Sequence, residues 1–176
     1  SNTGVVASDQ AATTGTARYG AGGCSYGGDK GIFAFGGTPS AISTSNLVSN
    51  AGVVSSDVAG VGTARINMGS CEYGSDKGIF AYGTTSGASV VSMSNLVSNA
   101  GVVASDVTGV GTARDEVKAC RYGSTGTGIF GFGDTGSYVS ITNLVSNAGV
   151  VASDTAGVGT ARKRIGACEY GQDKGI

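Results

Sequence analysis

One unit of about 48 residues recurs almost four times along this chain, and this periodicity limits the folds that the chain can adopt. The tripeptide Thr-Ala-Arg returns at spacings of 47, 49 and 48 residues, and one Asp, one Cys and one Tyr return with it. Each unit must therefore form the same local structure and bury its apolar side chains against its neighbours. The recurring residues are Asp9, Arg18, Cys24, Tyr26, Asp57, Arg65, Cys71, Tyr73, Asp106, Arg114, Cys120, Tyr122, Asp154, Arg162, Cys168 and Tyr170.

The repeat makes residues 1–176 a single repeat domain. Its units span 16–62, 63–111 and 112–159, with partial units at 1–15 and 160–176. We expect the blades at the two ends of the row to be incomplete. Either a partner segment completes them, or the chain is a slice of a larger ring.

Each unit is typical of four short antiparallel strands separated by turns. In the second full unit the extended runs lie at 63–73, 78–83, 89–97 and 101–105, with Gly, Ser, Asp and Asn between them. No segment shows the 3.6-residue apolar period of a helix. Four strands per repeat of this length predict an all-β fold, a β-propeller with four-stranded antiparallel blades. A β-solenoid is the alternative, although its coils are usually shorter.

The composition excludes several classes of protein. Glycine is abundant at 33 residues with a single proline, which argues for many tight turns and against collagen. Charged residues make up 13% and the net charge is −1, so there is no basic surface for nucleic acid. No apolar run is long enough for a membrane helix, and we expect no membrane insertion. The first residues lack a signal-peptide pattern.

The sequence of the unit resembles that of a kelch blade. The sequence Thr-Ala-Arg is followed by small residues, by Cys-x-Tyr-Gly and by the apolar run Lys30–Gly37, which ends in a glycine pair. The later units depart from this pattern with Gly83-Thr84 and Gly133-Asp134, and the kelch Trp is absent. The runs Tyr-Gly-x-Asp-Lys-Gly-Ile-Phe and Asn-Leu-Val-Ser-Asn-x-Gly-Val-Val resemble repetitive kelch-like proteins of tailed bacteriophages. That resemblance implies a protein associated with the phage tail or fibre.

The recurring residues have structural explanations. Each unit holds one Cys and the chain has no His, so we expect buried free thiols rather than a disulfide or a zinc site. The repeated Arg and Asp predict an ion pair or a turn cap, and the Tyr is expected to pack between blades. We expect no metal and no cofactor.

Catalysis has little support, because the chain offers no His, no repeated carboxylate pair and no nucleophile elbow. The positions that vary between units are the candidate binding surface, with drift on a solvated surface as the alternative. Loops at 38–43, 84–90 and 134–139 vary as well. The candidate binding residues are Asn67, Glu72, Asp115, Glu116, Arg121, Tyr138, Lys163 and Arg164.

These features predict a non-enzymatic structural and adhesive protein of a virion or extracellular surface, most simply a phage tail or fibre component that contributes to host attachment. The partners expected are other virion or surface subunits, further copies of the repeat and a host surface glycan. The alternatives are a carbohydrate-binding lectin-type propeller and a bacterial cell-surface or filament protein. A kelch-type sugar oxidase would need His ligands, which the chain lacks.

Overall fold

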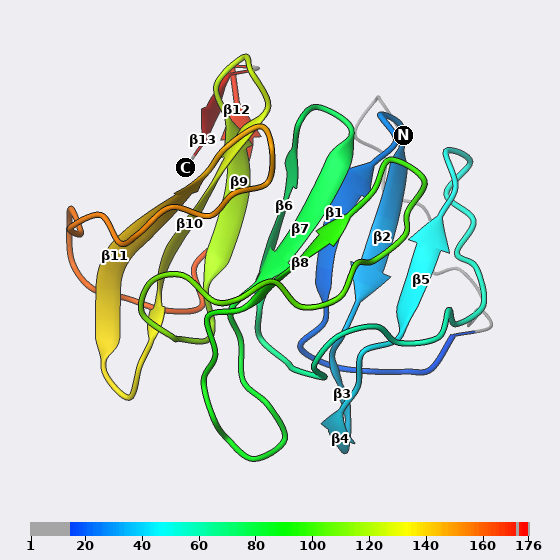
Figure 1. The fold of residues 1–176 in the computed structure, drawn as a ribbon, viewed down its shortest axis with the longest axis horizontal. Helices are drawn as coiled ribbons and strands as arrows, with labels where there is room; N and C mark the ends of the chain where they lie inside the picture. The colour runs from blue at the N-terminus through cyan, green and yellow to red at the C-terminus, as the bar shows by residue number, and fades with distance from the viewer. Residues whose placement is uncertain (1–14, 172, 176) are drawn as a thin grey trace.

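The chain folds into small antiparallel sheets that follow one another in the order of the repeat (Figure 1). A computed structural model describes residues 15–171 and 173–175, and these residues form strands, turns and bends without a helix. Among them, accordingly, no helix has the length and apolarity that a membrane crossing requires. The units are called unit I (16–62), unit II (63–111), unit III (112–159) and unit IV (from 160) below; Asp9 lies outside the described residues.

In units I to III the first strand pairs with the second and the second with the third, which makes a three-stranded antiparallel sheet. Unit IV contributes a first and a second strand, and unit I carries an extra small hairpin. The strands are β1 (Gly22–Tyr26), β2 (Lys30–Ala34), β3 (Gly37–Thr38), β4 (Ser40–Ala41), β5 (Ser45–Val48), β6 (Gly69–Tyr73), β7 (Lys77–Ala81), β8 (Ser94–Val97), β9 (Lys118–Tyr122), β10 (Thr127–Asp134), β11 (Tyr138–Val145), β12 (Glu169–Tyr170) and β13 (Lys174–Gly175).

The register of the first hairpin is the same in units I to III where its Cys and Ile are concerned. The Cys of the first strand lies opposite the Ile of the second, as Cys24 opposite Ile32 and Cys71 opposite Ile79. A glycine after the Tyr enters the turn with positive φ, 61° at both Gly27 and Gly74, which few other residues adopt without cost. The sequence repeat is therefore a repeat of strand register.

The prediction of four-stranded sheets needs correction. After β5 the chain returns along the sheet edge, but only the isolated bridges Val48–Val54 and Ser45–Val58 join it to β5. Between these bridges the Asn46 side chain donates to the Ser55 carbonyl at 3.1 Å. A side-chain amide thus takes the place of part of the backbone ladder, and the fourth segment stays irregular. Units II and III repeat this arrangement.

The hydrophobic core lies between units rather than inside them. One cluster joins Ile32 and Phe35 of unit I to Met68 and Phe80 of unit II. A second cluster joins Tyr82 and its neighbours of unit II to Val117 and Phe130 of unit III. A sheet of three short strands cannot cover its own apolar face, so stacking on the next unit is what removes these side chains from water.

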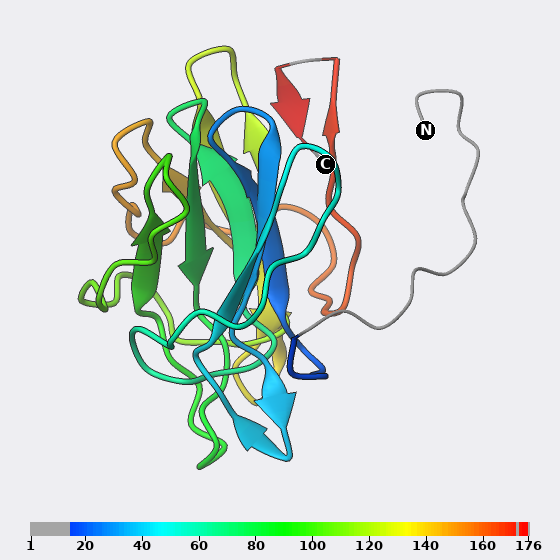
Figure 2. The ribbon, with the colours of Figure 1, turned by 90° about the vertical axis from the view of Figure 1, so that its right-hand side faces the viewer.

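The first strands of successive units lie side by side, β1 beside β6 and β6 beside β9, with β12 and β13 against β9 (Figure 2). They have no backbone ladder between them, but Ser70 bridges β6 to both backbone groups of Gly23. The turns between first and second strands form an upper end of the molecule, and β3–β4 with the loops at 84–90 and 134–138 form a lower end (Figure 1).

Replacing Gly69 by Ala should destabilise the protein, because a Cβ there would lie 2.7 Å from the Phe130 ring. Overpacking of this kind costs about 1–3 kcal/mol. The matched control is Gly166→Ala, since nothing lies within 4 Å of a Cβ at Gly166. Urea unfolding checks both variants. Equal unfolding free energies for the two variants would show that the stacked ring does not hold units II and III together.

Candidate functional site

The repeated Arg joins each unit to the one before it. The carbonyl of Arg65 accepts a hydrogen bond of 3.0 Å from the Gly36 amide, and its guanidinium lies 4.2 Å from the centre of the Phe35 ring. Arg114 stacks in the same way on Tyr82. Stacking of a desolvated guanidinium on an aromatic face is favourable by about 1–2 kcal/mol. The repeated Arg thus joins two neighbouring units across their boundary.

The aromatic residues under these Arg side chains adopt an uncommon backbone conformation. Phe35, Tyr82 and Phe132 have φ of 61°, 66° and 61°. Such a conformation is disfavoured for a bulky residue, and surrounding contacts must hold it. At Phe35 and Tyr82 the positive φ follows the end of the second strand, and at Phe132 it falls at the register shift within β10. In each case the ring lies beneath the guanidinium of the next unit.

The same Arg also closes its own unit through an Asn and an Asp. Arg65 donates to Thr63 O at 3.0 Å and to Asn95 Oδ1 at 2.5 Å. Asn95 donates in turn to Asp106 Oδ1 at 2.9 Å, and Asp106 accepts from the Thr63 amide and hydroxyl. The beginning and the end of the unit are thereby tied together. Equivalent networks in units I and III link Asp57 to Thr16 and Asn46, and Asp154 to Thr112 and Asn143.

The burial of these Arg residues is nearly complete. Arg65 and Arg114 are fully buried. Burial lowers the pKa of Arg65 to about 10, against the opposing influence of Asp106, and it lowers the pKa of Arg114 as well. With a pKa of about 10 Arg65 remains charged at neutral pH, and the hydrogen bonds of its terminal nitrogens and the stacked Phe35 ring replace part of the lost water.

Replacing Arg65 by Met should leave Asn95 Oδ1 and Thr63 O without their buried donor and should lower the free energy of unfolding by about 2–4 kcal/mol. Arg162→Met is the matched control. Arg162 stacks on Phe132 but is exposed, so its loss should cost less than about 1 kcal/mol. Chemical denaturation measures the free energy of unfolding of both variants. An Arg65 variant as stable as the control would show that Arg65 does not stabilise the contact between units.

The three carboxylates of these networks should make stability depend on acid pH. Hydrogen bonds from the Thr16 and Asn46 side chains hold the pKa of Asp57 below its usual value. Burial acts to raise the pKa of Asp106 and Asp154, but the hydrogen bonds from Thr and Asn outweigh it. A lowered folded-state pKa stabilises the fold above the unfolded value of about 3.9, and that stability is lost as the pH falls through the folded pKa.

The unfolding free energy of the protein should accordingly fall as the pH drops below about 4. Asp106→Asn should flatten this dependence. Unfolding curves between pH 2 and pH 7 test the slope separately from the absolute stability. If the unfolding free energies of wild type and Asp106→Asn depend on pH in the same way, the Asp106 carboxylate does not cause the loss of stability in acid.

The four Cys are not joined in disulfides, and each of the first three packs on the next unit. The sulfur atoms of Cys24, Cys71 and Cys120 contact the glycines of the following second strand, Gly78, Gly128 and Gly175, whose missing side chains make the room. Burial raises the pKa of Cys24 to about 12 and raises that of Cys71 further. These two thiols are therefore poor nucleophiles at neutral pH.

The repeated Tyr differ in burial along the row. Tyr26 and Tyr73 are buried, and their rings lie against Gly101 and Gly149 in the turns of the following unit. Tyr122 is partly buried, and Tyr170 of unit IV is 52% exposed.

Two groups of structural residues were not predicted from the sequence. The Asn of each network recurs with the same period as the Arg, so its structural role could have been inferred from the repeat. The stacked aromatic recurs too, although its partner belongs to the next unit and local patterns do not reveal such a contact. These residues are Asn46, Asn95, Asn143, Phe35, Tyr82 and Phe132.

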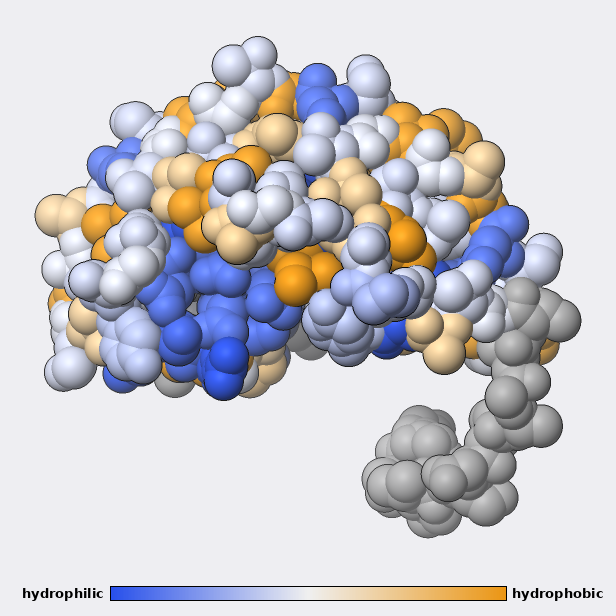
Figure 3. Space-filling view, turned by 90° about the horizontal axis from the view of Figure 1, so that it is seen from below, coloured by the Kyte–Doolittle hydropathy of each residue, from blue (hydrophilic) through white to orange (hydrophobic). Residues whose placement is uncertain are grey.

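The variable positions gather at the two ends of the row of first strands. At the lower end Glu116, only 8% exposed, pairs with Arg164 at 2.7 Å and with Lys163 at 3.2 Å. Lys163 also pairs with Asp134 at 2.7 Å and lies 5.1 Å from the centre of the Tyr138 ring. Figure 3 shows hydrophilic side chains gathered on part of this end.

Two more candidate residues complete the lower end. Asp115 accepts a hydrogen bond of 2.7 Å from the Thr84 hydroxyl of the preceding unit. The backbone of Asn67 accepts from the Glu116 amide and donates to the Gly20 carbonyl. Gly20, Asn67, Glu116 and Arg164 all have positive φ and occupy equivalent positions in the four units. The lower end is thus one row of residues that differ in side chain but share a backbone conformation.

At the upper end the variable positions form a separate cluster. Arg121 of unit III lies between Glu72 of unit II and Glu169 of unit IV, at 3.2 Å and 2.6 Å. This cluster and the lower one stand at opposite ends of β9. The eight candidate residues therefore do not form one site, and many of them connect neighbouring units instead of facing solvent alone.

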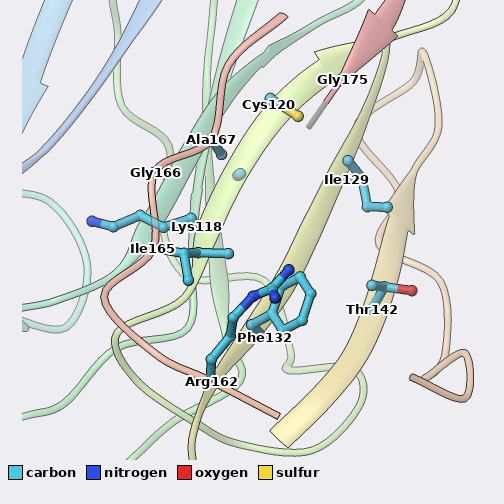
Figure 4. A pocket seen from close by; sticks show the side chains of 12 residues that line it. Lys118, Cys120, Ile129, Phe132, Thr142, Arg162, Ile165, Gly166, Ala167 and Gly175 are labelled. Atoms are coloured by element: carbon cyan, nitrogen blue, oxygen red, sulfur yellow. The ribbon is translucent and has the colours of Figure 1, made fainter. Parts of the chain in front are cut away.

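One cavity adjoins the lower cluster and another lies apart from both clusters. A cavity of about 280 Å³ at the lower end is lined by Gly20, Asn67, Met68, Glu116, Lys118 and Arg164. A more apolar cavity of about 460 Å³ lies between units III and IV, with Phe132, Ile129, Ile165, Arg162 and Cys120 on its walls (Figure 4). Within the described residues, no group of three His, Cys, Asp or Glu is arranged to hold a metal ion.

Successive antiparallel sheets with side-by-side first strands and a core between the sheets are the architecture of a β-propeller. The solved structure of YjhT, a kelch-repeat β-propeller protein, matches 77% of this chain with a TM-score of 0.58 and 14% sequence identity. The fold class inferred from the repeat is thereby supported in its coarser form, an all-β repeat that resembles a kelch propeller.

The likeness to YjhT concerns the fold alone at this identity. The match covers 44% of YjhT, so the chain corresponds to less than half of that protein. No protein-family profile and no curated protein matches the sequence.

Proposed function

We propose that this chain is a non-enzymatic structural and adhesive repeat protein that displays its lower end for attachment. The observation that carries this proposal is the separation of two sets of residues. The recurring Arg, Asp, Asn and aromatic residues close each unit and join it to its neighbour, whereas the lower end differs from unit to unit in both charge and loop length. A rigid frame with one varied end suits recognition by loops and strand ends.

Several lower-end groups are open to a partner. The Tyr138 ring is 58% exposed, and 74% of the Arg164 side chain is exposed beside the 280 Å³ cavity. Tyr and Arg are the residue types that contribute most to binding at protein surfaces. The ionisable groups of the cluster serve each other as ion-pair partners, which supports a binding role over acid–base catalysis.

The particle that carries this module is, in our proposal, a phage tail or fibre located outside the cell, where it contributes to host attachment alongside other virion subunits. The resemblance of the repeat wording to phage-encoded kelch-like proteins supports this choice. A bacterial cell-surface or filament protein built from the same unit is the alternative setting.

A lectin-type propeller is the second candidate function. It is favoured by one specific observation, the exposed Tyr138 ring next to Lys163, because an aromatic face beside polar donors is suited to stacking a sugar ring. Binding to an array of neutral and acidic glycans separates this candidate from attachment to a protein receptor.

Arg164→Ser and Tyr138→Ser should each weaken attachment at least about fivefold if the lower end is the contact surface. The measurement is binding of the fluorescently labelled protein to a panel of intact bacterial strains. Lys30→Ser at an upper hairpin turn is the matched control and should bind as wild type does. Absence of binding to every strain, or equal weakening by the control, would overturn the proposal.

A further inference from the structure

We propose that the cavity of about 280 Å³ at the lower end, called the lower cavity below, binds one acidic sugar residue, with Lys118 as the side chain that recognises its carboxylate. This inference rests on the proposed use of the lower end for recognition, and it names the class of ligand that this end takes. Four units contribute to the cavity, and each brings a different polar group to it.

Lys118 departs from the repeat at its own position. The equivalent residues of units I, II and IV are Gly22, Gly69 and Gly166. Lys118 is exposed, and within the part of the chain that the structure describes its ammonium makes no hydrogen bond and no ion pair. Figure 4 shows the ammonium pointing away from Phe132. All three N–H groups of this ammonium are thus available to a ligand.

The Lys118 side chain lies beside two adjoining cavities. It lines the lower cavity and a second cavity of about 220 Å³, and the two cavities also share Ala21 and Met68. The walls of the second cavity otherwise consist of small residues of the four first strands, such as Gly69 and Ala167. The unpaired charge therefore stands in a concave space, where it attracts an anion more strongly than it would on a flat surface in water.

Arg164 brings further donors to the lower cavity. Its Nε and Nη2 atoms both lie 2.7 Å from Glu116 Oε1, so this ion pair uses one edge of the guanidinium. Among the described residues nothing accepts a hydrogen bond from Nη1, and 74% of the side chain is exposed. Arg164 and Glu116 neutralise each other, which leaves Lys118 as the net positive charge among the residues that line the cavity.

Glu116 carries a buried oxygen that lacks a donor. The residue is only 8% exposed, and its Oε2 atom lies 3.2 Å from the Lys163 ammonium but accepts no hydrogen bond within the described residues. A buried acceptor without a donor costs free energy. A hydroxyl group of a ligand in the cavity would supply the missing hydrogen bond.

Asn67 offers both a donor and an acceptor at the same cavity. Its Oδ1 atom lies over Gly20, only 2.8 Å from the place that a Cβ would take there. Its side-chain amide makes no hydrogen bond in the part of the chain that the structure describes. An amide of this kind can donate to one hydroxyl of a sugar and accept from another.

This set of groups fits an acidic sugar better than a neutral sugar or a bare anion. The single unpaired cation, Lys118, matches a single carboxylate, and a hydrogen bond between two charged groups is stronger than one between neutral groups. Asn67 and Glu116 Oε2 match hydroxyl groups, which a bare anion does not have. Met68 offers an apolar contact for the carbon face of the ring. Since ligand sites usually begin at about 300 Å³, the lower cavity suits one sugar residue rather than a long saccharide.

Titration of the whole chain with glucuronate, followed by calorimetry, tests the ligand class. The matched ligand is glucuronamide, in which an uncharged amide replaces the carboxylate. Glucuronate or its epimer galacturonate should bind at least about tenfold more tightly than glucuronamide. Failure of both acids to bind in the millimolar range would overturn the proposal. Inorganic phosphate that binds as tightly as these acids would reduce the cavity to a plain anion site and overturn it as well.

The variant Lys118→Met tests the residue that recognises the charge. It keeps an unbranched side chain and removes the ammonium, and the fold should tolerate it because Lys118 is exposed and makes no hydrogen bond or ion pair within the described residues. Glucuronate affinity should fall at least about tenfold, with glucuronamide affinity unchanged. Lys30→Met at an upper hairpin turn is the control, because it changes the net charge equally and should bind glucuronate as wild type does. Unchanged glucuronate binding by Lys118→Met would overturn the proposal.

The two proposals for the lower end can fail separately. Glucuronate binding is measured on the isolated protein, and attachment is measured on intact bacteria. A protein that attaches to cells but binds neither acid refutes the acidic sugar and keeps the attachment surface. A protein that binds glucuronate through Lys118 but attaches to no strain supports the sugar site and refutes attachment.

Discussion

The stacking of an aromatic ring and a guanidinium across each unit boundary is the constraint on which the rest of the structure depends. A sheet of three short strands has too little area to form a core of its own, so its stability comes from the next sheet. Phe35, Phe80 and Arg65 supply that contact between units I and II, and Tyr82, Phe130 and Arg114 supply it between units II and III. The glycines, the thiols that pack on them and the positive φ of Phe35 and Tyr82 all serve the close approach that this stacking demands.

Much of the frame could be predicted from the sequence, because a repeat transfers the same local structure to every unit. The strands, their antiparallel pairing and the likeness to a propeller followed from the turn residues and the period. The irregular fourth segment could not be predicted, because a strand pattern does not reveal that the Asn46 side chain donates to the backbone carbonyl of Ser55. The ring beneath Arg65 was hidden for a different reason, namely that the contact joins Phe35 to a residue in another unit.

The candidate site was harder to predict than the frame. Variation between repeats marks positions that the frame does not need, but it does not say whether those positions face solvent or each other. Asp134 and Lys163 have opposite charges, and this becomes meaningful only when the fold places them 2.7 Å apart. The variable residues therefore fall into two groups. Some of them join two units through ion pairs, and others, such as Tyr138, remain exposed.

The ion pairs between units have a consequence for how the chain assembles. Nearly identical neighbours can exchange strands or pair out of order during folding, a characteristic failure of repeat proteins. The frame contacts are the same at successive boundaries and cannot distinguish a correct neighbour from a wrong one. Glu72 with Arg121, Arg121 with Glu169 and Glu116 with Arg164 differ from boundary to boundary. A wrong neighbour would leave some of these charges unpaired. A few residues that differ between the units therefore favour the correct order of units over a wrong one.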